Sequence, residues 1–368
     1  MSECIRVLHV IGMMDRGGAE AFIMNTYRNI DRSKIQFDFI VHTQKPCAYD
    51  NEIRVLGGRV YNALPRYTGF NHFEYVHKWQ EFFKEHPEYR LIHGHVRSTA
   101  AIYLYIAGKY GLTTIAHTHN TSSGTGLACI ARELLKYPIR YLADYMFACS
   151  EAAGEFTYGK GCKKNYRVVK NAIDTDNFKY NEPVRAKLRA ELALGESFLI
   201  GHVGRFEAQK NHTFIIDIFE QIVLRNKTAK LILIGAGELL EEIAMKAKNK
   251  GVLEKIIFTG VKPNVFEYLQ AMDVILFPSL YEGLPVAIVE SQAAGLPHVL
   301  SDSISDEIDM GMNLIEFISL DKPAEFWAER ILRKQNFKRV TDIQKIIANG
   351  YDIQENARFL QEFYLQNS

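Results

Sequence analysis

The chain has 368 residues, of which 47% are hydrophobic and 24% are charged. This length exceeds one ordinary core and predicts two domains, and the composition is that of a globular protein rather than a disordered or fibrous one. The formal net charge is +1, but residues 1–172 carry 22 Lys and Arg against 15 Asp and Glu, whereas residues 173–368 carry 22 against 28. We therefore expect the first half to meet an anionic surface or substrate.

Cysteine usage and hydropathy set the expected compartment. The five cysteines, at positions 4, 47, 129, 149 and 162, are odd in number, widely spaced and free of any Cys-x-x-Cys pair. This pattern favours reduced thiols over disulfides or a zinc site. The chain starts directly with a predicted strand rather than a signal peptide, and no apolar stretch approaches the length that spans a bilayer. We expect a cytoplasmic protein whose membrane contact would be peripheral, at the inner face of the cytoplasmic membrane.

Strands and helices alternate through the first half. The expected strands are residues 6–11, 37–43, 58–63, 91–95, 113–117, 145–149 and 168–171. The expected helices are residues 19–29, 72–86, 99–110 and 129–142. Short apolar runs between helices are typical of buried parallel strands.

The alternation restarts in the second half. The expected strands are residues 198–203, 230–234, 256–259, 274–277 and, as the last one, 298–301. The expected helices are residues 212–224, 239–250, 265–271, 285–294, 324–332 and 352–365. Two such series predict an α/β protein with two doubly wound parallel-sheet domains that face each other across a cleft. We place the domains at residues 1–172 and 173–345, with a helical tail at 346–368.

Two carboxylates flank a predicted strand-to-helix turn. Glu282 lies in the loop before Pro285, and Glu290 falls inside an apolar helix beside Val289 and Ala293. A carboxylate in so apolar a helix is costly unless a polar group partners it. The pair suits a ligand with many hydroxyls, although a helix-dipole Glu and a solvated Glu would give the same pattern.

Two cations follow the first predicted strand of the second half. Gly204-Arg205 follows that strand, and Lys210-Asn211 opens the next helix. A guanidinium, an ammonium and helix N–H groups together form a phosphate clamp, whereas the plain alternative is a pair of solvated cations. In the first half, Gly17-Gly18 would let the backbone approach a phosphate or sugar closely. No complete Gly-x-Gly-x-x-Gly fingerprint accompanies either loop.

Histidines gather at strand ends in the first half, notably His117 and His119. Their imidazoles could bind a sugar hydroxyl or a leaving phosphate, although capping or core histidines are common. We expect the two side chains to point to opposite faces of the sheet, and no third ligand lies nearby in sequence. Metal binding is therefore not expected.

The predicted helix 129–142 carries Arg132, Lys136 and Arg140 on one face. A basic amphipathic helix can rest on anionic lipid, but most helices of this kind are ordinary surface helices.

Seven short motifs in order along the chain resemble the retaining family-four glycosyltransferases of the GT-B fold, notably members that make bacterial exopolysaccharide or capsule. The motifs are Gly17-Gly18-Ala19-Glu20, residues 117–120, Ser150-Glu151, residues 171–174, Gly204-Arg205 with Lys210-Asn211, Gly235-Ala236-Gly237, and the segment from Glu282 to Glu290. The last has two glutamates separated by seven residues, which is the hallmark of that family. The tail fits the family's last helix, which crosses back to the first domain.

The resemblance implies roles for the matching residues. Glu290 would bind ribose, Arg205 and Lys210 would hold the diphosphate, and Glu282 would contact the donor sugar. One of His117 and His119, with His119 favoured, would also contact the sugar. Gly17, Gly18 and Gly204, with the backbone of Gly283, Leu284 and Pro285, would complete the nucleotide-sugar site.

The implied reaction transfers a sugar, with retention, from a nucleoside-diphosphate sugar to a saccharide or polyprenyl-linked acceptor. We expect no metal or other cofactor, since no Asp-x-Asp is evident, and no nucleic-acid partner. A nucleotide-sugar 2-epimerase of the same architecture and a two-domain sugar-binding protein are the alternatives.

Overall fold

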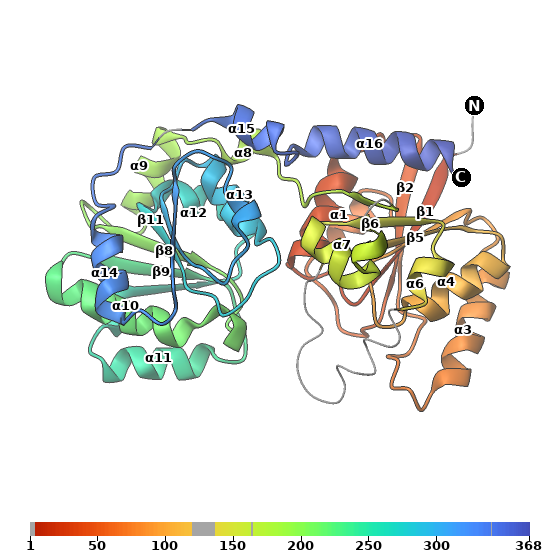
Figure 1. Ribbon diagram of the computed structural model, residues 1–368, viewed down its shortest axis with the longest axis horizontal. Helices are drawn as coiled ribbons and strands as arrows, with labels where there is room; N and C mark the ends of the chain where they lie inside the picture. Colours follow the sequence, from red (N-terminus) through yellow and green to blue (C-terminus); the bar gives the residue numbers. More distant parts are fainter. Residues whose placement is uncertain (1–3, 120–136, 163–164, 340) are drawn as a thin grey trace. The chain divides into compact units, whose positions relative to one another are not determined.

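In the computed structural model, the chain forms two compact units (Figure 1). Unit 1 consists of Met1–Ile173 and Asp352–Ser368, and unit 2 consists of Asp174–Tyr351. The structure describes residues 4–119, 137–162, 165–339 and 341–368. The units meet one residue after the boundary expected at 172, and the tail rejoins unit 1 six residues later than expected at 346.

Unit 1 is built on a seven-stranded parallel sheet of order β3-β2-β1-β4-β5-β6-β7. The strands are β1 Ile5–Ile11, β2 Ile35–Val41, β3 Val60–Tyr61, β4 Leu91–Gly94, β5 Thr113–Thr118, β6 Tyr145–Ala148 and β7 Tyr166–Val168. Its helices are α1 Gly18–Asn29, α2 Asp50–Val55, α3 His72–Glu85, α4 Ala100–Lys109, α6 Ile139–Leu142, α7 Glu151–Tyr158 and α16 Ile353–Gln366, with the 3-10 turn η1 Lys160–Cys162. The short helices α2 and α7 were not among the expected elements.

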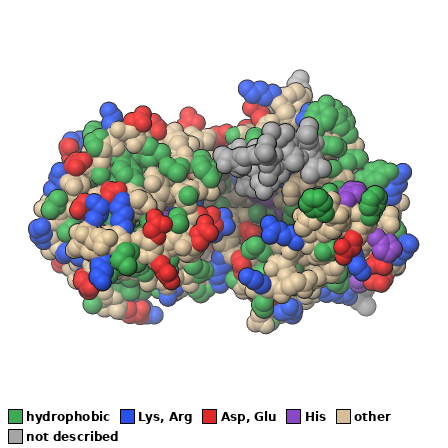
Figure 2. Space-filling model, turned by 90° about the horizontal axis from the view of Figure 1, so that it is seen from below, with side chains coloured by type: hydrophobic (Ala, Val, Ile, Leu, Met, Phe, Trp, Pro, Cys, Tyr) green, Lys and Arg blue, Asp and Glu red, His purple; other side chains and the backbone are tan. Residues whose placement is uncertain are grey.

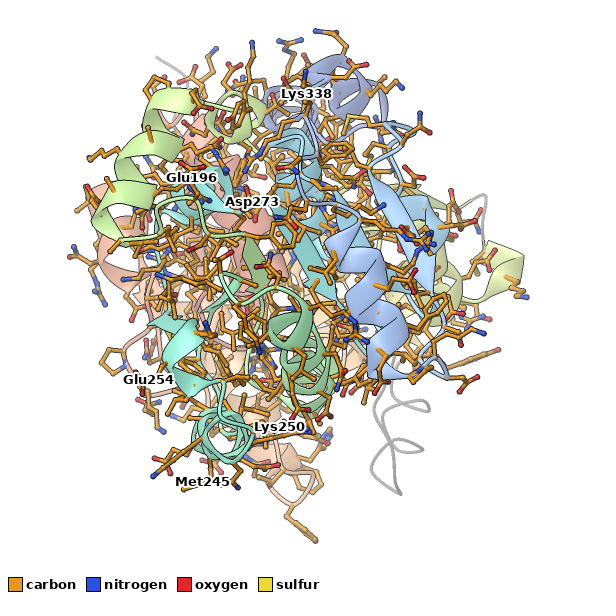
Figure 3. The ribbon with its side chains drawn as sticks, turned by 90° about the vertical axis from the view of Figure 1, so that its left-hand side faces the viewer. Glu196, Met245, Lys250, Glu254, Asp273 and Lys338 are labelled. Carbon is orange, nitrogen blue, oxygen red and sulfur yellow. The ribbon has the colours of Figure 1, made fainter. Side chains whose placement is uncertain are left out.

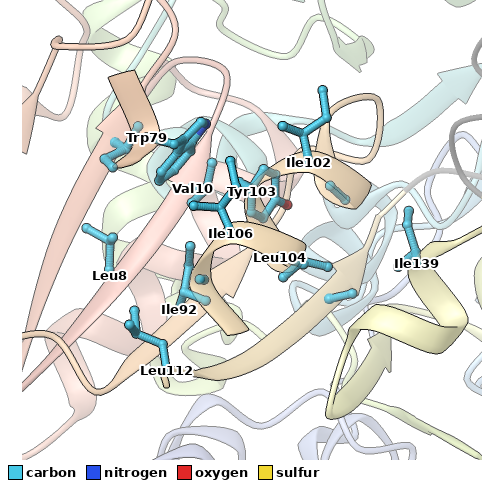
Figure 4. Close-up of a cluster of buried hydrophobic side chains, with 14 of the residues drawn as sticks. Leu8, Val10, Trp79, Ile92, Ile102, Tyr103, Leu104, Ile106, Leu112 and Ile139 are labelled. Carbon is cyan, nitrogen blue, oxygen red and sulfur yellow. The ribbon is translucent and has the colours of Figure 1, made fainter. Parts of the chain in front are cut away.

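Alternating apolar residues give this sheet a hydrophobic core on each face. Leu8, Val10 and Ile92 pack with Trp79 of α3 and Tyr103 of α4 on one face (Figure 4). The residues between them in sequence, including Val7, Leu91 and Ile115, point to the other face, beneath α1 and α16. This two-residue period decides which side chains reach each face.

The last helix of the chain belongs to unit 1. Tyr364 of α16 is fully buried, and its hydroxyl lies 2.7 Å from Nδ1 of His93. Gln361 accepts a hydrogen bond from the backbone N–H of Asp31 at 2.8 Å. Unit 1 therefore depends on a segment that follows the whole of unit 2 in sequence.

Unit 2 contains a six-stranded parallel sheet of order β10-β9-β8-β11-β12-β13. The strands are β8 Leu199–Val203, β9 Lys230–Ile234, β10 Ile256–Gly260, β11 Val274–Phe277, β12 His298–Ser301 and β13 Ile315–Ile318. The helices are α8 Thr175–Phe178, α9 Glu182–Glu191, α10 His212–Arg225, α11 Leu240–Asn249, α12 Val265–Ala271, α13 Val286–Ala293, α14 Ala324–Leu332 and α15 Ile343–Ala348, with 3-10 turns η2 Ala208–Lys210, η3 Leu253–Lys255 and η4 Asp306–Ile308.

The expectation that residues 298–301 form the last strand was wrong. Residues Ile315–Ile318 add β13 at the edge of the sheet, paired in parallel with β12. The strand is only four residues long, and Glu316 interrupts its apolar pattern because its carboxylate pairs with Lys334 at 2.8 Å. A partly exposed edge strand of this kind lacks the continuous apolar run of a central strand.

Asp273 anchors α9 to the start of β11 in unit 2 (Figure 3). Its carboxylate lies 2.6 Å from Arg185 and 3.4 Å from Arg189, and it accepts the backbone N–H of Leu199 at 2.7 Å. This half-buried network fixes β8 and β11, the two central strands that lead into the candidate site.

On the face seen in Figure 2, unit 2 mixes charges of both signs, and hydrophobic side chains gather on part of unit 1. Large exposed apolar side chains of unit 1 include Phe73, Tyr105 and Tyr141. Within the described part of the chain, none of the helices combines the length and apolar character needed to cross a bilayer.

Candidate active site

Unit 2 has its topological switch point between β8 and β11. The chain leaves β8 toward β9 on one side, and it leaves β11 toward β12 on the other side. Ligands of open parallel sheets bind where the strand order reverses, at the carboxyl ends of the strands. The loops that follow β8 and β11 are therefore the first place to look for a site.

Backbone contacts hold the loop after β8 close to the loop after β9. Gly204 donates its N–H to the Ile234 carbonyl at 2.9 Å, and Phe206 donates to the Ala236 carbonyl at 3.0 Å. Gly235 has a φ of +146°, and a Cβ at this position would overlap the carbonyl oxygen of Gly204. Only glycine allows so close an approach of two backbones.

An ion pair joins the loops that follow the two central strands. Nζ of Lys210 lies 2.6 Å from Oε1 of Glu282, and the two side chains are 16% and 7% exposed. The ammonium also lies 4.7 Å from the centre of the Phe277 ring, at the end of β11. An ion pair this well covered is screened less by solvent than a surface pair.

Neutral side chains reinforce this connection. Gln209 donates to Oε2 of Glu282 at 3.1 Å and to the carbonyl oxygen of Tyr281 at 3.0 Å. Asn211 has a φ of +55° and donates to the carbonyl oxygen of Pro278 at 3.1 Å. Both oxygens of the Glu282 carboxylate are thus partnered, which fixes its position at the carboxyl ends of the strands.

Arg205, the second expected cation, is placed differently from Lys210. Its side chain is 66% exposed, and Nη1 lies 3.0 Å from the carboxylate of Glu207. Exposed ion pairs contribute little to stability, so the guanidinium can exchange this partner at small cost. A cation of this kind can reorient toward an incoming anion.

Glu290 lies in α13, as expected, and its carboxylate has no hydrogen-bond or ion-pair partner among the described side chains. Burial raises the pKa of this half-buried group from 4.5 to about 7. An unpartnered carboxylate in an apolar helix is costly. Hydroxyl groups of a ligand would supply the missing hydrogen-bond donors.

Gly283, Leu284 and Pro285 connect the two glutamates. Pro285 is the N-cap of α13, and its carbonyl oxygen accepts the N–H of Ile288 at 2.9 Å. Leu284 is buried and Gly283 is half-buried. The helix therefore begins at Val286, and the N–H groups of Val286 and Ala287 precede the first intrahelical hydrogen bond.

In unit 1, Gly17 and Gly18 lie at the start of α1, directly after the loop from β1. Gly17 is the N-cap in an extended conformation, and Gly18 is the first helical residue. Phe22 of the same helix packs edge-on against the ring of His117, at 5.1 Å between centroids. The start of α1 is thereby linked to the expected histidine pair.

The prediction that His117 and His119 point to opposite faces was wrong. Their rings stack at a centroid distance of 4.2 Å, because residues two apart on a strand share a face. The same parity places His9 of β1, His93 of β4 and His95 directly after β4 on that face. The sequence contains the signal for this cluster, a His-x-His motif at the ends of two neighbouring strands. It was missed because the second pair was assigned to opposite faces of the sheet.

The five imidazoles could hold a metal ion in two ways. The ligand atoms of His9, His93 and His95 lie within 4.8 Å of one another, and so do those of His95, His117 and His119.

The basic face expected on helix 129–142 is described only in part. Arg132 and Lys136 lie outside the described residues. Arg140 lies in α6, with its guanidinium 4.3 Å from the centre of the exposed Tyr137 ring.

Sequence comparison assigns the family. Residues 16–177 match Glycosyltransferase Family 4, and residues 197–333 match Glycosyl transferases group 1. The Bacillus subtilis (strain 168) protein EpsF, named as a glycosyltransferase, is 36% identical over 98% of this chain and 96% of its own length. The chain belongs to this family of glycosyltransferases. A Staphylococcus aureus capsular polysaccharide biosynthesis glycosyltransferase, CapH, is 22% identical over 99% of both chains.

Solved structures confirm the fold of this glycosyltransferase. Anabaena Alr3699/HepE in complex with UDP-glucose superimposes with a TM-score of 0.75, at 17% identity over 98% of each chain. The expected α/β class with two parallel-sheet domains is therefore confirmed.

Proposed function

We propose that this glycosyltransferase moves a sugar, with retention of anomeric configuration, from a nucleoside-diphosphate sugar to a saccharide or polyprenyl-linked acceptor in cell-surface polysaccharide synthesis. Unit 2 takes the nucleotide, and the first part of unit 1 serves the acceptor side. The relatives support this proposal, since CapH is named for capsular polysaccharide biosynthesis and HepE binds UDP-glucose.

The observation that carries the proposal is the ion pair between Lys210 and Glu282 at the switch point of unit 2. An ammonium group has three N–H donors, and one of them serves Glu282. The others can meet diphosphate oxygens, while Glu282 stays fixed by Gln209. The pair thus offers a cation for the leaving group beside an acceptor for sugar hydroxyls.

The charges of the reaction explain why cations are needed there. Breaking the bond between sugar and phosphate leaves negative charge on the diphosphate and positive charge on the sugar ring. Lys210, Arg205 and the first-turn N–H groups of α13 would stabilise the former. Because these groups come from the protein itself, we propose that the diphosphate needs no metal ion.

The nucleotide would be held through Glu290. Ribose hydroxyls can donate to its unpartnered carboxylate, which lies in α13 beside the buried residues Ile288 and Val289. Satisfying this group offsets part of the cost of its burial.

In unit 1, we assign the sugar contact to His119. His117 is 3% exposed and its Nδ1 lies 3.2 Å from Nε2 of His93, so its ring is already enclosed. His119 is half-buried and more open to a ligand. Gly17 and Gly18 would let the start of α1 approach the donor and acceptor closely.

A peripheral membrane contact would bring a polyprenyl-linked acceptor within reach. Arg140 and Tyr141 of α6, with Tyr137 just before it, form a basic and aromatic surface in which both rings are exposed. Such surfaces bind anionic lipid, and we propose from the sequence spacing alone that Arg132 and Lys136 contribute to the same contact.

The deciding experiment incubates the purified protein with a panel of nucleotide sugars and acceptors. We expect nucleotide release that accelerates with acceptor, and an NMR spectrum of the product that shows the anomeric configuration of the donor. An epimerised donor formed without acceptor would support the 2-epimerase instead. An inverted product would refute retention but leave the transferase intact.

A further inference from the structure

The imidazole cluster of unit 1 consists of His9, His93, His95, His117 and His119. It arises because three neighbouring strands, β1, β4 and β5, place histidines on the same face in matching register. His9 pairs with His93 across β1 and β4, and β4 pairs with β5 in turn. Core positions on that face are otherwise filled by apolar residues such as Leu91 and Ile115. Five adjacent imidazoles therefore stand out on a sheet face that is otherwise apolar.

One row of hydrogen bonds runs through three of these rings and ends at an amide. Nδ1 of His119 lies 3.2 Å from Oδ1 of Asn171, an acceptor, so this nitrogen carries the proton. Nε2 of His119 then accepts from Nδ1 of His95 at 2.9 Å, and Nε2 of His95 accepts from Nδ1 of His9 at 3.0 Å. The row leaves Nε2 of His9 buried, without a partner among the described residues.

The ring nitrogens of one triad are already gathered as a metal ion would need them. The ligand atoms of His95, His117 and His119 lie within 4.8 Å of one another. Nε2 of His117 is buried and has no hydrogen-bond partner among the described residues. This ring can therefore turn that nitrogen to an ion without giving up a hydrogen bond there.

The geometry points to one late first-row transition-metal ion, of the Zn²⁺ class, bound by His95, His117 and His119. Imidazole nitrogen is a preferred ligand of these ions. Tetrahedral ligands at about 2.0–2.1 Å from zinc lie about 3.3 Å apart, so the 2.9 Å between His95 and His119 needs to widen only slightly. The ion would take the place of the proton on Nδ1 of His95. That ring would then carry its proton on Nε2 and donate to Nδ1 of His9, and His9 would carry its own proton on the unpartnered Nε2.

Two further observations favour this triad over His9, His93 and His95. His119 directs one nitrogen toward the cluster and donates the other N–H to the Asn171 carbonyl oxygen, which is the outer-shell arrangement of metal-binding histidines. His95 and His119 are half-buried, whereas His9 and His93 are enclosed. An ion can therefore reach His95 and His119 more directly than the enclosed pair. With three protein ligands, the fourth coordination position of the ion stays open for water or a ligand.

Calorimetric titration of chelator-treated full-length protein with Zn²⁺ tests this site, with Co²⁺ as a spectroscopic probe. We expect one ion per chain and a visible Co²⁺ spectrum of nitrogen ligation. His119→Gln should weaken binding at least about tenfold. His42→Gln removes a half-buried imidazole of unit 1 outside the cluster, where Nε2 contacts the Tyr75 hydroxyl at 2.7 Å, and it should leave binding unchanged.

Asn171→Asp keeps every ligand and therefore covers the case in which His119→Gln does not fold. A carboxylate makes His119 a stronger ligand, so we expect affinity to rise by about tenfold. An affinity for Zn²⁺ that changes with neither substitution would overturn the proposed triad. So would a wild-type affinity no higher than that of exposed surface histidines. In either case the cluster would be only a stack of neutral core imidazoles.

One consequence rests on the proposed function. If His119 also contacts the donor sugar, the ion and the nucleotide sugar compete, and Zn²⁺ should raise the apparent KM for the donor. Zn²⁺ that binds without changing KM would refute the sugar contact of His119 but not the ion site. A wild-type protein that binds no Zn²⁺ but has normal transferase activity would refute the ion site and leave the proposed function standing.

Discussion

The ammonium of Lys210 and the carboxylate of Glu282 lie 2.6 Å apart, although 72 positions separate them in the chain. Each residue belongs to a loop that follows a central strand of unit 2. Gln209 adds hydrogen bonds to the Tyr281 carbonyl oxygen and the Glu282 carboxylate in the second loop. The pair therefore couples a cation suited to a leaving diphosphate to the loop suited to the sugar. Mutations can separate this functional role from a merely structural one.

Lys210→Ala should lower kcat/KM for the nucleotide sugar by about 100-fold or more, because it removes a charge that stabilises the leaving group. Lys246→Ala is the matched control, since Nζ of Lys246 lies 2.6 Å from Asp217 in the same unit, away from the switch point. The control should keep normal turnover. Steady-state kinetics with both variants decide the matter, and near-normal turnover in Lys210→Ala would remove this residue from the reaction.

Glu290 should make stability depend on pH. Burial raises its pKa from 4.5 to about 7, so the folded protein keeps this proton between those pH values while the unfolded chain loses it. The contribution of Glu290 to the free energy of unfolding therefore falls as pH rises from 4.5 to 7. Glu290→Gln should gain stability relative to wild type across that window and level off above it. Parallel denaturation curves for the two proteins from pH 5 to 8 would contradict the raised pKa.

The same residue should control nucleotide affinity. The ionised carboxylate accepts ribose hydroxyls better than the protonated form, so wild-type affinity for the nucleoside diphosphate should weaken as pH falls below 7. Glu290→Gln should bind more weakly, by about 1.5–3 kcal/mol, with a smaller dependence on pH. Calorimetry at pH 6 and 8 measures both effects, and unchanged affinity in the variant would refute the ribose contact.

Gly235→Ala should destabilise unit 2 and weaken donor binding together. A Cβ at this position would overlap the carbonyl oxygen of Gly204, and φ is +146°. Gly251→Ala is the control, since its φ of +68° is also unfavourable for alanine but a Cβ would meet open space. We expect the control to lose about 1 kcal/mol of stability from backbone strain alone, and Gly235→Ala to lose more. Equal losses would show that the two loops can move apart freely.

Charge reversal at Arg140, and at Arg132 and Lys136 before it in sequence, should reduce membrane binding. Arg140→Glu, alone and together with Arg132→Glu and Lys136→Glu, changes a surface that also exposes Tyr141. Each basic residue near an anionic surface contributes about 1 kcal/mol, so the single variant should lose about fivefold in vesicle affinity and the triple variant more. Lys187→Glu in unit 2 is the control, because its side chain is 76% exposed. Sedimentation with phosphatidylglycerol vesicles measures the difference, and equal binding by all variants would dismiss this surface.

The strand-loop-helix frame of the site was predictable from sequence, because β8, β11 and α13 have strong local patterns. Apolar runs mark the strands, and Pro285 marks the helix start. The pairing of Lys210 with Glu282 was not predictable, since it depends on the order of strands in the sheet. A single sequence gives residue spacing along each strand but not which strands become neighbours.

The imidazole cluster shows a second limit. His93-x-His95 and His117-x-His119 each predict two side chains on one face, and the wrong parity assigned to the second pair hid their convergence. Even with correct parity, the contribution of His9 depends on β1 lying beside β4. The contact between His93 and Tyr364 could not be predicted from any local pattern, because 271 positions separate the two residues.

Tyr364→Phe should therefore test how firmly the last helix belongs to unit 1. The substitution keeps the buried ring but removes the hydroxyl that lies 2.7 Å from Nδ1 of His93, which leaves that nitrogen enclosed and unpartnered. We expect a loss of about 1–3 kcal/mol in the free energy of unfolding. Tyr110→Phe is the control, since its exposed hydroxyl donates to the Gln80 carbonyl at 3.2 Å and its loss should cost less than about 0.5 kcal/mol. Urea denaturation of both variants compares the two losses. Equal stabilities would mean that water replaces the lost hydroxyl beside His93, and that α16 is held by its apolar contacts alone.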